Sequence, residues 1–221
     1  MSSKIAPTKP LLIMLYGYPG AGKSYFARQL TEHLQAAHVQ GDRIRGELFE
    51  TPQFDKQENA VVMQLMDYMT HEFLGAGISV VYDTNAMRHA ARHNLREMAR
   101  RAHAKSVLIW LQIDADGAFA RASSRDRRRA DDKYAAPTDR ATFDNIAAHM
   151  QNPQTVEDYI VISGKHTFNT QFSAVVKRLR ELGLLTQDDA NTKVVKPGLV
   201  NLIPNPMAGR VDMSRRNIVI R

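Results

Sequence analysis

The chain has 221 residues, a length that fits one domain or one domain with an appendage. It contains no cysteine, which excludes disulfides and thiolate metal sites, and its net charge of +7 favours a polyanionic partner such as a nucleotide, a nucleic acid or a phosphorylated small molecule. No stretch approaches the roughly 18 apolar residues of a membrane span, and residues 1–10 lack the apolar segment of a secretion signal. We therefore expect a soluble, cytoplasmic protein.

Apolar runs of strand type alternate with stretches of helical spacing. The strands are predicted at residues 11–16, 37–40, 78–82, 106–113 and 159–162. The helices are predicted at residues 24–37, 43–49, 56–74, 87–103, 115–128, 138–150 and 167–182, with Thr138 as the N-cap of the sixth. Five strands separated by helices predict an α/β fold in three layers, with helices on both faces of a five-stranded parallel sheet. Trp110, inside an apolar strand, is expected in the core.

The end of the chain has a different pattern. Short apolar runs at residues 194–195, 199–203 and 218–220 are separated by prolines and glycines. They are typical of a short C-terminal β arm made of small antiparallel strands. Because the arm carries no catalytic motif, packing or subunit contact is favoured over a role in substrate binding. A homodimer held through this arm is one expectation.

Residues 17–24 read Gly-Tyr-Pro-Gly-Ala-Gly-Lys-Ser, a full match to the phosphate-binding pattern GxxxxGK[ST]. A predicted strand leads into this phosphate loop and a predicted helix leads out, which is the context that the pattern requires. The glycines let successive backbone N–H groups turn towards phosphate oxygens, and the helix presents its positive end to the same anion. Lys23 would bridge the outer phosphates and the Ser24 hydroxyl would bind Mg²⁺. The loop predicts a nucleoside triphosphate site, the alternative being a glycine-rich turn with a lysine by accident.

A carboxylate, Asp42, follows the second predicted strand. Ligands of such sheets bind at the carboxyl ends of the strands, so we expect Asp42 at the rim that carries the phosphate loop. There it can accept a proton from an attacking hydroxyl or orient it, unless it only caps the helix that begins near Arg43. Arg45, about one helical turn on, can hold an anionic part of the acceptor by a two-pronged contact.

A second carboxylate follows the third predicted strand, in Asp83-Thr84-Asn85, and Arg88 opens the next helix. Asp83 can hold Mg²⁺ together with Ser24, or hydrogen-bond the acceptor. Thr84 and Asn85 are small polar groups at a helix N-terminus, where they can bind anions or hydroxyls or merely cap the helix. With Asp42 on the same rim, a functional role is favoured.

Five arginines lie between residues 121 and 129. Interleaved aspartates allow a solvated helix face, but an arginine that closes over the phosphates as part of a lid would stabilise the charge that spreads during phosphoryl transfer. Arg121 and Arg125 are one helical turn apart and can point the same way. Arg125 is favoured first as the lid arginine and Arg121 second, with residues 127–129 left to solvent or polyanion contacts.

The phosphate loop, Gly41-Asp42-x-x-Arg45, Tyr82-Asp83-Thr84-Asn85 with Arg88, and Arg121-x-x-x-Arg125 together resemble the kinase domain of bacteriophage-type polynucleotide 5′-kinases and related small phosphate-loop kinases. The resemblance covers roughly residues 10–165, and Ala122 departs from it where the family usually has asparagine. It implies the P-loop NTPase/kinase form of the predicted fold, with a kinase domain over residues 1–185, a lid at about 121–140 and a C-terminal extension over 186–221.

The resemblance further implies an ATP- and Mg²⁺-dependent kinase that phosphorylates a hydroxyl, with a nucleic-acid 5′-end or a nucleoside-like molecule as the acceptor. Lys23, Asp42 and Arg125 would be the catalytic residues, with Asp42 as general base. The nucleotide would be bound by Gly17, Pro19, Gly20, Ala21, Gly22, Lys23, Ser24, Tyr25, Arg121 and Arg125. The acceptor would be bound by Asp42, Arg45, Asp83, Thr84, Asn85 and Arg88, and the metal by Ser24 and Asp83.

Three alternatives stay open on the sequence. The acceptor can be a small molecule such as a sugar or an antibiotic, because relatives with the same core phosphorylate small molecules. The protein can be a non-catalytic or slowly hydrolysing nucleotide switch. It can also be a toxin-like kinase that acts on a cell-wall sugar nucleotide. ATP rather than GTP follows only from the resemblance.

Overall fold

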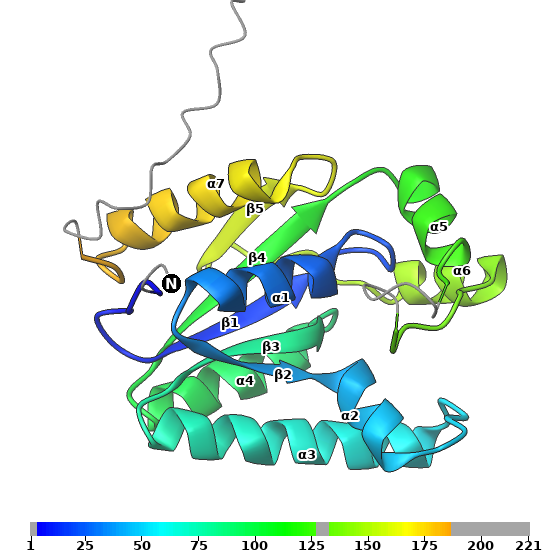
Figure 1. The fold of residues 1–221 in the computed structure, drawn as a ribbon, viewed down its shortest axis with the longest axis horizontal. Coiled ribbons are helices and arrows are strands. Elements are labelled where there is room, and N and C mark those ends of the chain that lie inside the picture. Colours follow the sequence, from blue (N-terminus) through cyan, green and yellow to red (C-terminus); the bar gives the residue numbers. More distant parts are fainter. Residues whose placement is uncertain (1–3, 127–132, 187–221) are drawn as a thin grey trace, which may run out of the picture.

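The computed structural model describes residues 4–126 and 133–186. Within them strands and helices alternate along the chain (Figure 1). The elements are β1 (Leu11–Tyr16), α1 (Lys23–His33), β2 (Ala36–Gln40), α2 (Gly41–Leu48), α3 (Lys56–Gly75), β3 (Ser79–Asn85), α4 (His89–Arg101), β4 (Lys105–Gln112), α5 (Ala115–Ser123), α6 (Arg140–Ala148), β5 (Tyr159–Ser163) and α7 (Phe168–Glu181). The predicted C-terminal arm and arginines 127–129 lie outside the described residues.

The five strands form one sheet in the order β2-β3-β1-β4-β5, and all four pairings are parallel. The carboxyl ends of the strands therefore meet at one rim. Figure 1 shows α2, α5 and α6 beyond this rim, on the right. Because β1 is the central strand, the phosphate loop starts from the middle of the rim, between the segments that follow β3 and β4. The α/β fold predicted from the sequence is confirmed.

The core lies in two layers, one on each face of the sheet. Alternate residues of β1 enter different layers, as the two-residue period of a strand requires. Leu11, Ile13 and Leu15 pack with residues of α1 and α7, such as Phe26 and Phe172. The other layer combines Leu12, Met14 and Tyr16 with residues of α3 and α4, such as Val62, Met66 and Leu95. No helix in the described part of the chain is long and apolar enough to span a membrane.

The structure corrects several helix ends predicted from the sequence, and α5 for example ends at Ser123 rather than near residue 128. The first helix stops at His33, because Gln35 donates its N–H to Ile5 and leaves the helical hydrogen-bond pattern. The N-cap of α6 is Asp139, whose carboxylate accepts from the N–H of Thr142 at 2.8 Å. Thr138 was the wrong choice, because its own N–H is bonded to the carbonyl of Ala122 at the end of α5.

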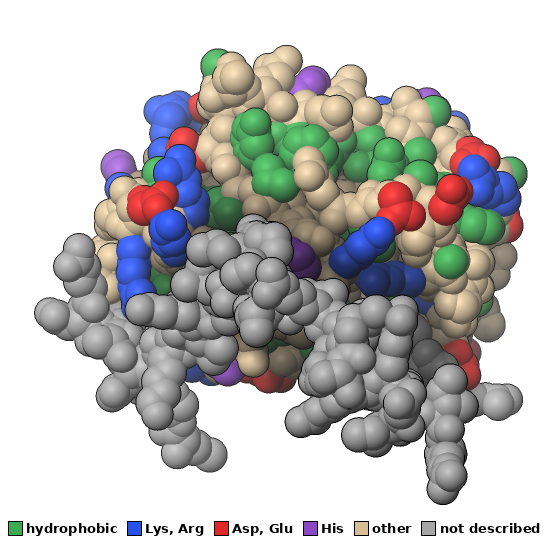
Figure 2. All heavy atoms as spheres, turned by 90° about the horizontal axis from the view of Figure 1, so that it is seen from above, with side chains coloured by type: hydrophobic (Ala, Val, Ile, Leu, Met, Phe, Trp, Pro, Cys, Tyr) green, Lys and Arg blue, Asp and Glu red, His purple; other side chains and the backbone are tan. Residues whose placement is uncertain are grey.

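Trp110 lies in β4 but is only partly buried. It is opposite Val161 of β5, the strand at one edge of the sheet, and Val161 is 45% exposed. The Trp110 ring packs against the core layer that contains residues of α3 and α4, as expected of a core residue, and it also lines a pocket. Figure 2 shows hydrophobic side chains gathered on the face seen from above, with basic and acidic side chains on both sides of them.

Candidate functional site

The phosphate loop is a turn of bare backbone between β1 and α1. Gly17, Gly20 and Gly22 have φ angles of 150°, 82° and 95°, values that residues with a side chain rarely adopt. A Cβ at Gly17 would lie 2.5 Å from the carbonyl oxygen of Leu111, and one at Gly20 would overlap the backbone of α5 at Ala118. Gly22 caps α1 without a side-chain hydrogen bond. The first N–H groups of α1 therefore have no capping side chain, which suits an anion at this helix end.

The side chain of Lys23 turns back into the loop. Its ammonium donates to the carbonyl oxygens of Gly17 and Tyr18, both at 2.8 Å. The pKa of Lys23 is lowered to about 8, chiefly by burial and next by the charge of Arg125, whereas the charges of Asp83 and Asp42 act to raise it. An influence of this kind requires proximity, so these four side chains from four separate segments share one small region.

Asp83, in β3, is bonded on both of its carboxylate oxygens. Oδ1 accepts from the Ser24 hydroxyl at 2.9 Å, and Oδ2 lies 2.9 Å from Nε2 of His38 in β2. The Asp83 side chain is only 2% exposed. A hydroxyl and a carboxylate are the oxygen ligands that Mg²⁺ prefers, so this pair fits the metal expected beside a triphosphate.

His38 is a residue of this site that the sequence analysis missed. In the β2–β3 register it is opposite Val81, two residues before Asp83, and side chains two apart on a strand point to the same face. Strand alternation would have found it once the pairing of β2 with β3 was known, but the sequence does not give that pairing.

Asp42 lies in the first turn of α2, half-buried. Burial raises the pKa of its carboxyl, and so does the neighbouring charge of Asp83, whereas Arg125, Arg45 and Lys23 act to lower it. A carboxylate with a raised pKa is a stronger proton acceptor than an exposed one. The structure thus brings Asp42 to the same place as Lys23, Asp83 and Arg125.

Arg45 is held mainly by the protein itself. Its guanidinium donates to Glu58 at 3.1 Å and to Asn59 at 2.5 Å, both in α3, and lies 4.8 Å from the ring centroid of Phe54. Only Nε is left buried without a partner among the described residues. Arg45 therefore reaches the site as a charge near Asp42 rather than as an open two-pronged group, because α3 supplies a carboxylate that the sequence did not connect to it.

Asn85 ends β3, opposite Leu15 at an irregularity in the pairing with β1. Both polar atoms of its side-chain amide are buried and have no partner among the described residues. Arg88, the N-cap residue of α4, is exposed, and its side chain makes no hydrogen bond or ion pair within the described chain. Thr84, between Asp83 and Asn85, is half-buried. These side chains are available to a bound molecule, whereas Asp83 is already engaged.

The two arginines of the predicted lid have different surroundings. Arg125 donates to the carbonyl oxygen of Ala136 at 3.3 Å and is close enough to affect Lys23 and Asp42. Arg121 is exposed and donates to the carbonyl oxygen of Gly164 at 2.8 Å, in the connection between β5 and α7. Arg125 therefore lies near Lys23 and Asp42, whereas Arg121 contacts the connection between β5 and α7.

Within the predicted lid, at about residues 121–140, the chain returns to α2 at Tyr134. The ring of Tyr134 packs on Gly46, and its hydroxyl donates to Glu47 at 3.2 Å. This contact joins the lid to the helix that carries Asp42. Of the remaining predicted residues, Pro19 and Ala21 lie within the phosphate loop, whereas Tyr25 is 43% exposed beneath the guanidinium of Arg28.

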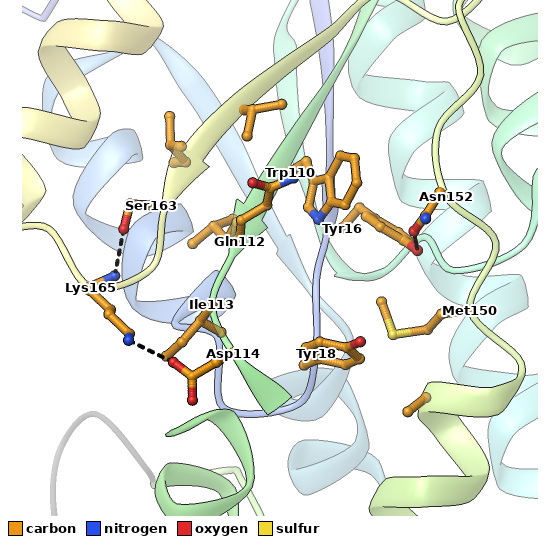
Figure 3. A pocket seen from close by; sticks show the side chains of 14 residues that line it. Tyr16, Tyr18, Trp110, Gln112, Ile113, Asp114, Met150, Asn152, Ser163 and Lys165 are labelled. Atoms are coloured by element: carbon orange, nitrogen blue, oxygen red, sulfur yellow. Dashed lines mark hydrogen bonds and ion pairs between the residues drawn. The ribbon is translucent and has the colours of Figure 1, made fainter. Parts of the chain in front are cut away.

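A pocket of about 830 Å³ lies beside the phosphate loop (Figure 3). Three aromatic side chains line it, those of Tyr16, Tyr18 and Trp110, and Asn152 closes one side through a 2.9 Å hydrogen bond from the Tyr16 hydroxyl. On the opposite side in Figure 3 an ion pair between Lys165 and Asp114 forms part of the lining. Apart from Tyr18, which lies in the phosphate loop, the sequence pointed to none of these residues as part of a site.

The model of the AAA domain family matches residues 12–153 of the chain. Three solved structures share its fold at 15–17% identity, each over 79% of this chain. They are the APS kinase CysC of Mycobacterium tuberculosis with AMPPNP and APS (17% identity, 99% of that chain, TM-score 0.55), a gluconokinase of Sinorhizobium meliloti (15%, 93%, 0.54) and Kti12 of Chaetomium thermophilum with ADP-AlF3 (15%, 99%, 0.58). At these identities the likeness shows the fold alone, that of a P-loop kinase. No curated protein matches the chain.

Proposed function

Because the chain belongs to the AAA domain family, whose model covers well over half of it, we propose that it is a kinase that transfers the γ-phosphate of ATP to a hydroxyl. The observation that carries the proposal is the position of the phosphate loop at the rim of the sheet, where Ser24 donates to Asp83 at 2.9 Å and Arg125 is close enough to affect the pKa of both Lys23 and Asp42. A phosphate cradle, two carboxylates and a lid arginine in one region are the parts that phosphoryl transfer uses.

The phosphate loop and the start of α1 would bind the triphosphate through backbone N–H groups. Lys23 would leave the carbonyl oxygens of Gly17 and Tyr18 and turn to the outer phosphates, where a negative charge stabilises its protonated form. Ser24 and Asp83 would hold Mg²⁺, which when bound supplies positive charge to the phosphates. Arg121 and Arg125 would cover the nucleotide from the side of α5.

Asp42 would act as the general base. The acceptor oxygen attacks the γ-phosphorus, the bond from that phosphorus to the oxygen bridging to the β-phosphate breaks, and ADP leaves. The proton of the acceptor hydroxyl passes to the carboxylate of Asp42, whose raised pKa favours this transfer. Arg125 would stabilise the charge on the moving phosphoryl group.

The acceptor is proposed to be a nucleic-acid 5′-hydroxyl or a nucleoside-like molecule. The aromatic pocket beside the loop supports an acceptor with a planar ring, because Tyr18 and Trp110 offer ring faces for stacking. The segment that closes this pocket is bonded to the start of α4, since the N–H of Gln151 donates to the carbonyl of Met87 at 2.8 Å and its side chain accepts from the N–H of His89. The pocket is thereby next to Arg88, a predicted acceptor residue.

A small-molecule acceptor is the second candidate. The pocket volume of about 830 Å³ falls within the range of small-molecule sites, roughly 300–1,000 Å³. We further propose that the kinase domain ends near residue 185, since Leu185 forms the last β-bridge found within the described residues, with Pro7.

The test is γ-phosphate transfer from labelled ATP to a panel of 5′-hydroxyl oligonucleotides, nucleosides, sugars and antibiotics, with the full chain. We expect transfer to one of these classes, and the Asp42→Asn variant should lose at least about 100-fold in rate while ATP affinity stays within a few-fold. The matched control is the Asp144→Asn variant. Asp144 is an exposed residue of α6 that pairs with Arg140, and this variant should keep full activity. Tight ATP binding without transfer to any acceptor would favour the nucleotide switch instead.

A further inference from the structure

We propose that His38 is a positioning residue that orients Asp83 for the metal that accompanies the nucleotide. This inference rests on the proposed function, because it concerns the same Mg²⁺ site. Three segments meet at the Asp83 carboxylate, namely β3 itself, the start of α1 through Ser24, and β2 through His38. The sequence motifs account for the first two only.

The hydrogen bonds fix the rotation of the carboxylate. Asp83 Oδ1 accepts from Ser24 and Oδ2 lies 2.9 Å from His38 Nε2, so a turn of the group about its Cβ–Cγ bond breaks both contacts. With Nε2 protonated, the imidazole donates to Oδ2 and leaves Oδ1 directed at the hydroxyl that would bind the metal with it. Partners of this kind keep a ligand in the orientation that the metal requires.

Burial makes the contribution of His38 matter. The Asp83 side chain is 2% exposed, so a leucine in the place of the imidazole would cover Oδ2 without donating a hydrogen bond to it. The carboxylate would then turn to recover a partner, and Oδ1 would leave Ser24. His38 itself is 20% exposed at the side chain and lies on an edge strand outside both core clusters, so packing of the core does not explain it.

The loss of a partner behind a metal ligand typically weakens metal binding by about 10- to 100-fold. We therefore expect the His38→Leu variant to need about tenfold or more Mg²⁺ for the same tightening of ATP binding, with little change in ATP affinity when no metal is present. The His38→Gln variant can place an amide N–H close to the position of Nε2 and should recover most of the wild-type behaviour. A residue that only supports the fold would change both affinities together and would not distinguish leucine from glutamine.

The experiment is calorimetric titration of ATP into the full chain, in EDTA and over a series of Mg²⁺ concentrations, for the wild type and both His38 variants. The His71→Leu variant is the matched control, because it removes an exposed histidine–glutamate contact of 3.5 Å on α3 and should leave the Mg²⁺ dependence unchanged. Thermal melting of each variant reports folding.

A shifted Mg²⁺ dependence in His38→Leu, with metal-free affinity kept and with recovery in His38→Gln, is the expected result. An unshifted Mg²⁺ dependence in a folded His38→Leu protein would overturn the inference, and so would an equal loss with and without metal. The wild type serves as the separate test of the proposed function: if Mg²⁺ does not tighten its ATP binding, the Mg²⁺-dependent kinase fails and the role of His38 fails with it.

Discussion

The guanidinium of Arg92 and the carboxylate of Glu157 form a paired contact inside the protein, although they are 65 residues apart in the sequence. Nε donates to one carboxylate oxygen at 2.7 Å and a terminal nitrogen to the other at 3.0 Å, and the side chains are 0% and 3% exposed. Arg96 and the N–H of Gln154 contact the same carboxylate at 2.8 and 2.9 Å. The group ties α4 to the segment before β5, next to the aromatic pocket.

The Glu157→Gln variant should lose about 3 kcal/mol of unfolding free energy, because it leaves Arg92 buried without its counter-charge. Urea unfolding measures this loss. Glu181→Gln is the control, since the Arg178–Glu181 pair is exposed by 48% and 46% and should contribute less than about 1 kcal/mol. Equal losses in the two variants would contradict the assignment.

The same glutamate predicts an acid limit to stability. Burial acts to raise the pKa of Glu157, but hydrogen bonds from Arg92 and Gln154 hold this pKa below its ordinary value. A depressed carboxyl pKa contributes stability that is present above the ordinary pKa and is lost as pH falls through the folded-state pKa. The gap between wild type and Glu157→Gln in unfolding free energy should therefore narrow in acid. A gap that stays constant from neutral to strongly acid pH would be the opposite result.

Lys23 predicts a trend at alkaline pH. Its folded-state pKa of about 8 lies below the ordinary 10.5, so the unfolded chain binds more protons between these values and wild-type stability gains from this group as pH rises. In Lys23→Gln that gain is absent. We expect the unfolding free energy of the wild type to rise relative to that of the variant between about pH 8 and 10.5, by at most about 3 kcal/mol, because one pKa unit corresponds to about 1.4 kcal/mol. Urea unfolding at several pH values checks it, and parallel profiles would show that Lys23 titrates normally.

The Gly46→Ala variant is expected to change the unfolding free energy and the affinity for ATP in different directions. A Cβ at this position would lie 2.9 Å from the Tyr134 ring and would displace it from Glu47. Alanine within α2 should keep or raise the unfolding free energy, by up to about 1 kcal/mol, while ATP binding weakens about threefold to tenfold, the equivalent of one lost hydrogen bond. Melting and calorimetry measure the two quantities.

Gly75→Ala is the control for this pair of effects. Gly75 ends α3, where a Cβ would meet nothing within 4 Å, so the substitution gives a helical alanine without touching the lid. If it weakens ATP binding as much as Gly46→Ala does, the Tyr134 contact is not the cause.

A substitution at Asn85 should likewise affect stability and binding of the acceptor in different ways. The buried amide of Asn85 has no partner in the described part of the chain, so Asn85→Leu should leave the unfolding free energy unchanged or raise it by about 1 kcal/mol. If the amide binds the acceptor, the same variant should raise the acceptor KM severalfold and leave the KM for ATP unaltered. Urea unfolding and steady-state kinetics check the two parts, and a loss of stability would mean that the amide is satisfied in solution.

The sequence predicted the strands and most helices because each is an apolar run or a helical stripe bounded by turn residues. It also predicted the phosphate loop, since only glycine tolerates the backbone angles found at Gly20 and Gly22. It did not predict the order of strands in the sheet, because pairing between distant segments leaves no local pattern. His38 was missed for that reason, as its place beside Asp83 depends on β2 pairing with β3.

Competition among polar groups was the other reason why parts of the site could not be predicted from the sequence. Arg45 was expected to be open to an acceptor, but Glu58 in α3 takes up part of its guanidinium. Thr138 was a plausible cap by residue type, yet its N–H bonds to Ala122 and Asp139 caps α6 instead. In both cases the residue type suits the predicted role, and a partner brought in by the tertiary fold decided how the residue was used.

At Gly20 the backbone of the phosphate loop touches that of α5 at Ala118 and Ala122 with no side chain between them. Peptide groups in such contact cannot slide or compress, so the base of α5 must move with the loop as one piece. Any hinge for the covering segment then lies past Ser123, where α5 ends. Arg121 lies within α5, before that point, and Arg125 lies beyond it, so of the two arginines only Arg125 is placed to move relative to the phosphate loop.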